Sequence, residues 1–178
     1  MQTIIDFGLR RPYPYKPQEM HLSDMYQRPG FLLRRTHQIS AAIFENACAS
    51  IGLTQAQYGA LTVLASEPHI DQSRLARALA FDKVTVLRVL RGLEERGLVA
   101  REVSTTSRRH MAVQLTPAGR RLLKKAEAPV HQAYEELMAP LNDKQRAQFI
   151  GLLQTLTDGL SAQARAAFVP LQAPDQDA

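Results

Sequence analysis

The sequence lacks the features that are typical of disulfide-rich, membrane-spanning and secreted proteins. It contains one cysteine, Cys48, and no tryptophan, so it has no internal disulfide and no cysteine cluster for a metal. No window approaches the roughly 18 apolar residues that a bilayer-spanning helix needs. Its first residues also lack a charged start followed by an apolar stretch and a cleavage site. We therefore expect a cytoplasmic protein.

Catalytic motifs are missing as well. The sequence shows no glycine-rich phosphate loop after a strand, no serine elbow and no carboxylate pair placed for acid and base roles. Its five histidines are scattered without the spacing of metal ligands. We expect neither an enzyme nor a bound metal or other cofactor.

Positive charge is concentrated in one part of the chain. The 178 residues carry 22 Lys/Arg and 17 Asp/Glu, for a net charge of +5. Residues 71–121 hold eleven of the basic and five of the acidic residues, a net charge of +6, which leaves −1 for the remainder. Such a distribution is typical of a surface that neutralises phosphates.

Two short helices are predicted in this basic region. The first helix is predicted over residues 71–80, with Asp71 as its N-cap. The second is predicted over residues 82–97, with Asp82 as its N-cap and Gly97 at its end. The second helix buries one stripe and turns cations and small apolar groups outward, a combination that suits the phosphates, guanines and thymine methyls of a major groove. A solvated amphipathic helix would show the same periodicity, so this pattern alone leaves both interpretations open.

Two strands are predicted directly after these helices. Residues 98–103 and 110–115 alternate in polarity, and the polar stretch STTSRR lies between them as an exposed hairpin tip. Arg108 and Arg109 lie at its downstream shoulder. Adjacent guanidinium groups on a projecting hairpin favour a phosphate or minor-groove contact, although charge that merely keeps a loop soluble is the alternative.

These motifs resemble those of the MarR (multiple antibiotic resistance regulator) family. The resemblance is carried by LARAL, LEERGLVAR and SRRHMAVQLTPAG, and it extends to GLTQAQYGALTVLA at 52–65, covering roughly residues 30–165. It implies a winged helix-turn-helix lobe carried by long dimerisation helices, mainly α with a small β-hairpin wing. One position departs from the family pattern, because Ser107 stands where the family usually has an aspartate that braces a wing arginine.

The predicted DNA contacts combine this resemblance with the basic face of the second helix. They comprise residues at the start of the first helix, on the outer face of the second and on the wing: Ser73, Arg74, Lys83, Val84, Thr85, Leu87, Arg88, Arg91, Ser107, Arg108 and Arg109.

The rest of the chain predicts further helices around this lobe. We expect an N-terminal arm over 1–29, dimerisation helices within 30–52 and 117–166, the winged lobe over 53–116, and a frayed tail over 167–178. Thr54 and Gln57 form a capping-box pattern. Pro129 should kink or break the helix that starts after Thr116, and the last helix should run from Asn142 to about Ala166.

The resemblance also implies partners. A two-fold homodimer would place two recognition helices about 34 Å apart on an imperfect palindromic operator. Many family members are released from DNA by an aromatic acid or phenol, and here a hydroxybenzoate- or nicotinate-type acid is expected. The residues able to hold it are Arg34, Arg35, His37, Tyr58 and His110.

The function that we infer from the sequence is a dimeric repressor of a catabolic or efflux operon, released by such an acid. Two alternatives stay open. In one, the lobe is a protein-interaction module that does not read DNA. In the other, Cys48 senses oxidants, although no basic residue lies near it in sequence to lower its pKa.

Overall fold

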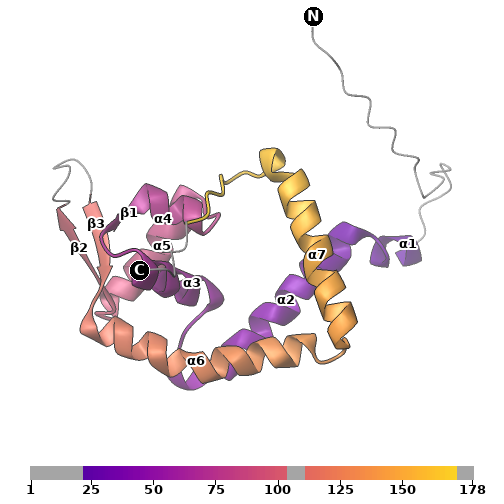
Figure 1. Ribbon diagram of the computed structural model, residues 1–178, viewed down its shortest axis with the longest axis horizontal. Coiled ribbons are helices and arrows are strands. Elements are labelled where there is room, and N and C mark those ends of the chain that lie inside the picture. Colours follow the sequence, from indigo (N-terminus) through magenta and orange to yellow (C-terminus); the bar gives the residue numbers. More distant parts are fainter. Residues whose placement is uncertain (1–21, 104–110, 172–178) are drawn as a thin grey trace, which may run out of the picture. The chain divides into compact units, whose positions relative to one another are not determined.

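The computed structural model of the chain describes residues 22–103 and 111–171 and divides into two units, residues 1–37 and 38–178 (Figure 1). In the smaller unit, helix α1 (Leu22–Tyr26) precedes helix α2 (Pro29–Ala47), whose later part belongs to the larger unit. The rings of Tyr26 and Phe31 meet edge to face at 5.2 Å. This contact ties α1 to the start of α2.

The larger unit is mainly helical with a small antiparallel sheet, which confirms the predicted fold class. After α2 its elements are η1 (Ala49–Ile51), α3 (Gln55–Ser66), β1 (Ile70–Asp71), α4 (Gln72–Ala78), α5 (Lys83–Glu95), β2 (Val99–Val103), β3 (Met111–Leu115), α6 (Pro117–Met138), α7 (Asp143–Gly159) and η2 (Ser161–Gln163). None of the described helices has the length and apolar character needed to cross a membrane.

The sheet has three strands in the order β1-β3-β2, one more than the sequence predicted. Strand β2 pairs with β3 so that Arg101 lies opposite Val113. Strand β1 adds only two residues on the other side of β3, with Ile70 opposite Val113. A strand of two residues is too short to produce an alternating pattern, which explains why it was missed.

Side-chain caps set where the main helices begin. The Thr54 hydroxyl accepts from the Gln57 N–H at 3.3 Å, and the Gln57 side chain accepts from the Thr54 N–H at 3.2 Å. Asn142 and Gln145 form the same reciprocal pair at the start of α7. Both capping boxes satisfy backbone donors that the first turn of a helix leaves without partners.

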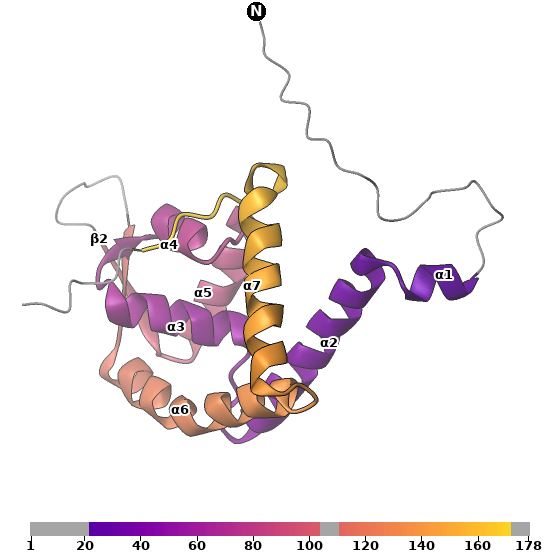
Figure 2. The same cartoon turned by 45° about the vertical axis from the view of Figure 1, so that its right-hand side comes forward.

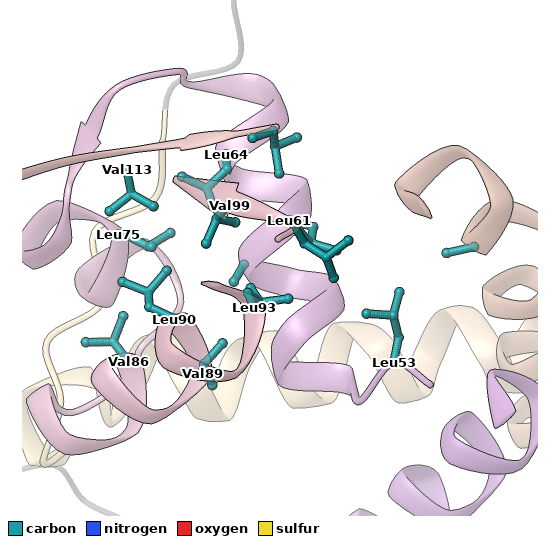
Figure 3. Close-up of a cluster of buried hydrophobic side chains, with 14 of the residues drawn as sticks. Leu53, Leu61, Leu64, Leu75, Val86, Val89, Leu90, Leu93, Val99 and Val113 are labelled. Carbon is teal, nitrogen blue, oxygen red and sulfur yellow. The ribbon is translucent and has the colours of Figure 1, made fainter. Parts of the chain in front are cut away.

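Helix α3 lies at the centre of the hydrophobic core. It packs against α4, α5, α6 and β3, and its Leu61 and Leu64 are almost fully buried. Figure 3 shows these side chains meeting Leu75 from α4, Leu90 and Leu93 from α5, and Val99 and Val113 from the sheet. Burial of these groups fixes the position of α5 relative to the rest of the lobe.

The junction between β3 and α6 explains the glycine of the TPAG motif. The Thr116 side chain caps α6 by accepting from the Gly119 N–H at 3.0 Å, and the Thr116 N–H donates to the Leu98 carbonyl at 3.1 Å. A Cβ atom at Gly119 would lie only 2.1 Å from that carbonyl oxygen. The helix can approach the start of β2 this closely only because residue 119 has no side chain.

Two predictions about the C-terminal half need correction. A break of α6 at Pro129 is wrong, because this proline lies inside one continuous helix, and the alternative, a kink, stays a prediction. The last helix ends at Gly159 instead of continuing to about Ala166. Capping and side-chain packing on both sides of a proline can maintain a helix that the proline alone would weaken.

The start of the expected frayed tail also contacts the lobe. The chain after α7 runs back to α4 (Figures 1 and 2), where the Val169 N–H donates to the Arg77 carbonyl at 3.1 Å. Leu171 packs against the core. We call residues 164–171 the C-terminal return segment. The hydrogen bond of Val169 and the apolar contact of Leu171 leave no periodic signal in the sequence.

Gly119→Ala is expected to destabilise the protein by about 2–4 kcal/mol, because the new methyl group meets backbone that has little room to move. Chemical denaturation measured by circular dichroism would give this change in the free energy of unfolding. Gly159→Ala is a matched control, since no atom lies within 4 Å of the added Cβ. Equal stability of the two variants would contradict this account of Gly119.

Candidate nucleic-acid interface

Helix α5 presents two faces of opposite character. Val86, Leu90 and Leu93 are fully buried, and Val89 is nearly so. Since residues on one face recur every three or four positions, this buried stripe turns the remaining side chains outward. Val84 is 76% exposed and Leu87 is 38% exposed, and the cations that accompany them are Lys83, Arg88 and Arg91.

The outer face of α5 forms one wall of a cavity of about 540 Å³. Arg101 from strand β2 forms the other wall. Among the residues that the structure describes, the lining consists of Val84, Leu87, Arg88, Arg91, Glu94 and Arg101. We call these six residues the arginine cavity. Three guanidinium groups with two apolar side chains suit an anionic ligand that also carries apolar surface.

One acidic side chain belongs to this cavity. The Glu94 carboxylate lies 2.9 Å from the Arg101 Nε atom, and the two side chains are 32% and 26% exposed. The same Nε atom is buried and has no hydrogen-bond partner. The close approach is therefore an attraction between charges without the alignment that a hydrogen bond requires.

The turn between α4 and α5 contains an unusual backbone conformation. Ala80 has a φ of 51°, in the left-handed region that favours glycine. The Phe81 N–H donates to the Ala76 carbonyl at 2.9 Å, which holds the turn closed. The side chain of Asp82 then caps α5 by accepting from the Thr85 N–H at 2.7 Å.

Helix α4 contributes two of the predicted DNA contacts. Ser73 and Arg74 are in its first turn, and their N–H groups donate to the Asp71 carboxylate at 2.8 and 2.9 Å. Both side chains are exposed. The Arg74 guanidinium forms an ion pair with Glu67, so a phosphate would have to compete with that carboxylate for it.

The C-terminal end of α5 is fixed by Arg96. Its guanidinium donates to the Gly52 carbonyl at 2.6 Å and to the Ile51 carbonyl at 2.9 Å. Gly52 has a φ of 60°, so it is a left-handed cap that ends the 3-10 turn after α2. Arg96 thereby joins the end of α5 to the connection between α2 and α3.

The predicted wing contacts lie outside the described residues. These are Ser107, Arg108 and Arg109, together with His110, which was predicted to contact a ligand. The strands before and after this segment are described, and Val103 of β2 pairs with Met111 of β3.

The other predicted ligand contacts fall in both units. Arg34, Arg35 and His37 are exposed residues of the smaller unit, and the Arg34 guanidinium lies 5.2 Å from the centroid of the Phe31 ring. Tyr58 belongs to the larger unit and is partly buried, with its ring 5.9 Å from that of Phe44. None of these residues lines the arginine cavity.

Cys48 has the properties of a core residue. It is fully buried among apolar side chains, and burial raises the pKa of its thiol. The thiolate is the form that reacts with oxidants, so both observations oppose the redox-sensing alternative.

Glu94 and Arg101 were not among the DNA contacts predicted from the sequence, although both line the arginine cavity. A signal for Glu94 was present, because it follows Leu87 and Arg91 by seven and three residues and therefore continues the same outer stripe. Arg101 had no such signal, because its position depends on how β2 packs beside α5.

Comparisons with known proteins agree with this geometry. A sequence profile described as MarR family matches residues 51–110. A Thauera aromatica protein named as a transcriptional regulatory protein for the hcr operon is 36% identical over 128 residues, covering 71% of this chain and 77% of that protein. The HTH-type transcriptional repressor Rv2887 of Mycobacterium tuberculosis is 34% identical over 127 residues, covering 71% of this chain and 91% of the repressor.

A solved structure is similar over the same extent. Bordetella bronchiseptica BpsR, whose DNA binding is regulated by 6-hydroxynicotinic acid, superposes with a TM-score of 0.67 at 32% identity. The match covers 72% of this chain and 98% of that one. More than a quarter of the present chain therefore lies outside the part shared with BpsR.

The cap of α5 makes a pH-dependent contribution to stability. The pKa of the Asp82 carboxyl is lowered, mainly because the carboxylate accepts a hydrogen bond from the Thr85 backbone N–H, and also because it accepts one from the Thr85 side chain. Its stabilising effect is present above the ordinary carboxyl pKa and is lost as the pH falls through the lowered value. Asp82→Asn keeps a capping side chain but removes this titration.

We therefore expect the stability difference between the wild type and Asp82→Asn, followed from about pH 7 to about pH 3, to stay constant down to about pH 5 and to change below that, with the wild type losing relative stability toward acid. Urea unfolding midpoints of both proteins across this range would measure it. A difference that stays constant with pH would contradict a charged cap.

Proposed function

The chain belongs to the MarR family of DNA-binding transcriptional repressors, and from this membership we propose that it binds operator DNA as a homodimer and is released by a small aromatic acid. The outer face of α5, where exposed apolar side chains lie among cations, is the observation that carries the DNA-reading part of the proposal. The similarity to BpsR supports the choice of effector.

In the proposed complex α5 enters the major groove. Its first residues are Lys83, Val84 and Thr85, and residues near the start of a recognition helix are the ones that reach base edges. The apolar side chain of Val84 is exposed to water, and in the major groove it would contact the methyl group of a thymine. Arg88 and Arg91 follow on the same face, where guanidinium groups meet guanine or phosphate.

The homodimer is proposed from the surface of α7. None of the 17 residues of this helix is buried. Its Ile150, Leu152 and Leu156, together with Leu160, the residue that follows the helix as its C-cap, are large apolar side chains that are 40–57% exposed. A helix with such a stripe is stable only when another surface covers it. A second copy related by a two-fold axis would bury both stripes and present two α5 helices to the halves of a palindrome.

The proposed effector is a carboxylate attached to an aromatic ring. Arginine binds a carboxylate through paired hydrogen bonds, and tyrosine or histidine packs on the ring. Arg34, Arg35, His37, Tyr58 and His110 remain the proposed contacts. The acid releases DNA only if it prefers a conformation in which the two α5 helices no longer match successive major grooves.

Arg88→Ala is expected to weaken binding to a duplex selected from a random library by the wild-type protein. The loss should be about tenfold or more, with a smaller loss on random-sequence DNA, because a base contact would disappear together with a charge. Fluorescence anisotropy titrations would measure both affinities. Lys124→Ala on α6 is the control, as it removes the same charge from an exposed residue outside the proposed DNA interface and outside α7, and equal losses in the two variants would exclude a reading role for Arg88.

Addition of 6-hydroxynicotinic acid is expected to lower the affinity for the selected duplex while the protein stays dimeric. Gel shifts and light scattering on the same samples would test this, with benzamide as an aromatic control that lacks the carboxylate. Dissociation into monomers would refute the proposed mechanism of release. No effect of this acid or of hydroxybenzoates would refute the effector class and leave DNA reading intact.

A further inference from the structure

The position of Glu94 within the arginine cavity is unfavourable for a surface that meets DNA. Three arginines and two apolar residues share the lining with this one carboxylate. Glu95, the next residue of the same helix, is exposed and does not line the cavity. The two acids therefore have the same charge and are adjacent in α5, but only Glu94 faces the cavity.

The attraction between Glu94 and Arg101 contributes little to the folded state. Both side chains are about a quarter to a third exposed, and ion pairs that water can reach add little stability. The Arg101 Nε atom is also buried without a hydrogen bond, a condition that an incoming oxygen atom could relieve. A phosphate oxygen is a stronger partner than this misaligned carboxylate, because it accepts from guanidinium in good geometry.

The place of Glu94 along α5 indicates which part of DNA it meets. It lies in the last turn of a helix that spans Lys83–Glu95. In helix-turn-helix complexes the residues near the start of the recognition helix reach the bases. Glu94 and Arg101 would then face the sugar-phosphate backbone, where a carboxylate is repelled.

We propose that Arg101 releases Glu94 and binds a DNA phosphate when α5 is fully inserted in the major groove of the specific site. In this proposal Glu94 raises sequence specificity, because its carboxylate opposes non-specific binding to DNA. Non-specific binding depends on phosphate attraction alone. A carboxylate that holds Arg101 and repels phosphates therefore weakens it directly. The specific complex forms the Arg101–phosphate contact and adds base contacts that Glu94 does not oppose.

This inference rests on the proposed reading of DNA by α5. Its test compares Glu94→Gln with Glu95→Gln, which change the net charge equally on adjacent residues of one helix. Affinities are measured by anisotropy at several salt concentrations on two duplexes of equal length, one selected by the wild-type protein from a random library and one of random sequence.

Glu94→Gln should bind the random duplex about three- to tenfold more tightly than Glu95→Gln does, with a salt slope steeper by about one phosphate contact. The gain on the selected duplex should be smaller, so the specificity ratio falls. In an Arg101→Met background the difference between the two glutamine variants should disappear, because no guanidinium is left to release.

Equal effects of the two glutamine substitutions, with wild-type binding intact, would overturn the inference alone. Weaker binding of Glu94→Gln to both duplexes would also overturn it, because Glu94 would then support the fold of the interface. Failure of the wild-type protein to enrich any duplex would overturn the proposed DNA reading itself.

Discussion

The buried stripe of α5 is the constraint on which the candidate interface depends. Val86, Leu90 and Leu93 are fixed in the core around α3, and a helix that fixes three such positions has no rotational freedom left. The outward direction of Arg88 and Arg91 follows from apolar packing on the opposite side. The charge of the interface is thus oriented by residues that never meet a ligand.

Much of this arrangement was predictable from the sequence. Periodicity and caps indicated α3, α4, α5 and the two longer strands, because each has several residues whose spacing reports the buried face. Helix α7 was also predicted, although its end was placed too late. The two-residue strand β1 gave no signal. The C-terminal return segment was not predicted either, because the last helix was expected to continue to about Ala166 and the chain from residue 167 was expected to fray.

The candidate site was less predictable than the fold. The outer residues of α5 could be identified because they belong to one helix. The ion pairs Arg74–Glu67 and Arg101–Glu94 join residues of different elements, and the hydrogen bonds of Arg96 reach the connection between α2 and α3, more than 40 residues earlier in the chain. Such contacts depend on how the elements pack against one another. Packing between elements produces no periodic spacing of residues, so it cannot be predicted from a single sequence in the way that a helix can.

The C-terminal return segment has a consequence for the order of folding. Its hydrogen bond joins Val169 to Arg77, residues separated by most of the lobe and by both α6 and α7. Closing so long a loop costs entropy before the contact contributes any stability. The segment should therefore dock after the lobe has formed, and during synthesis only after residues 169–171 have emerged.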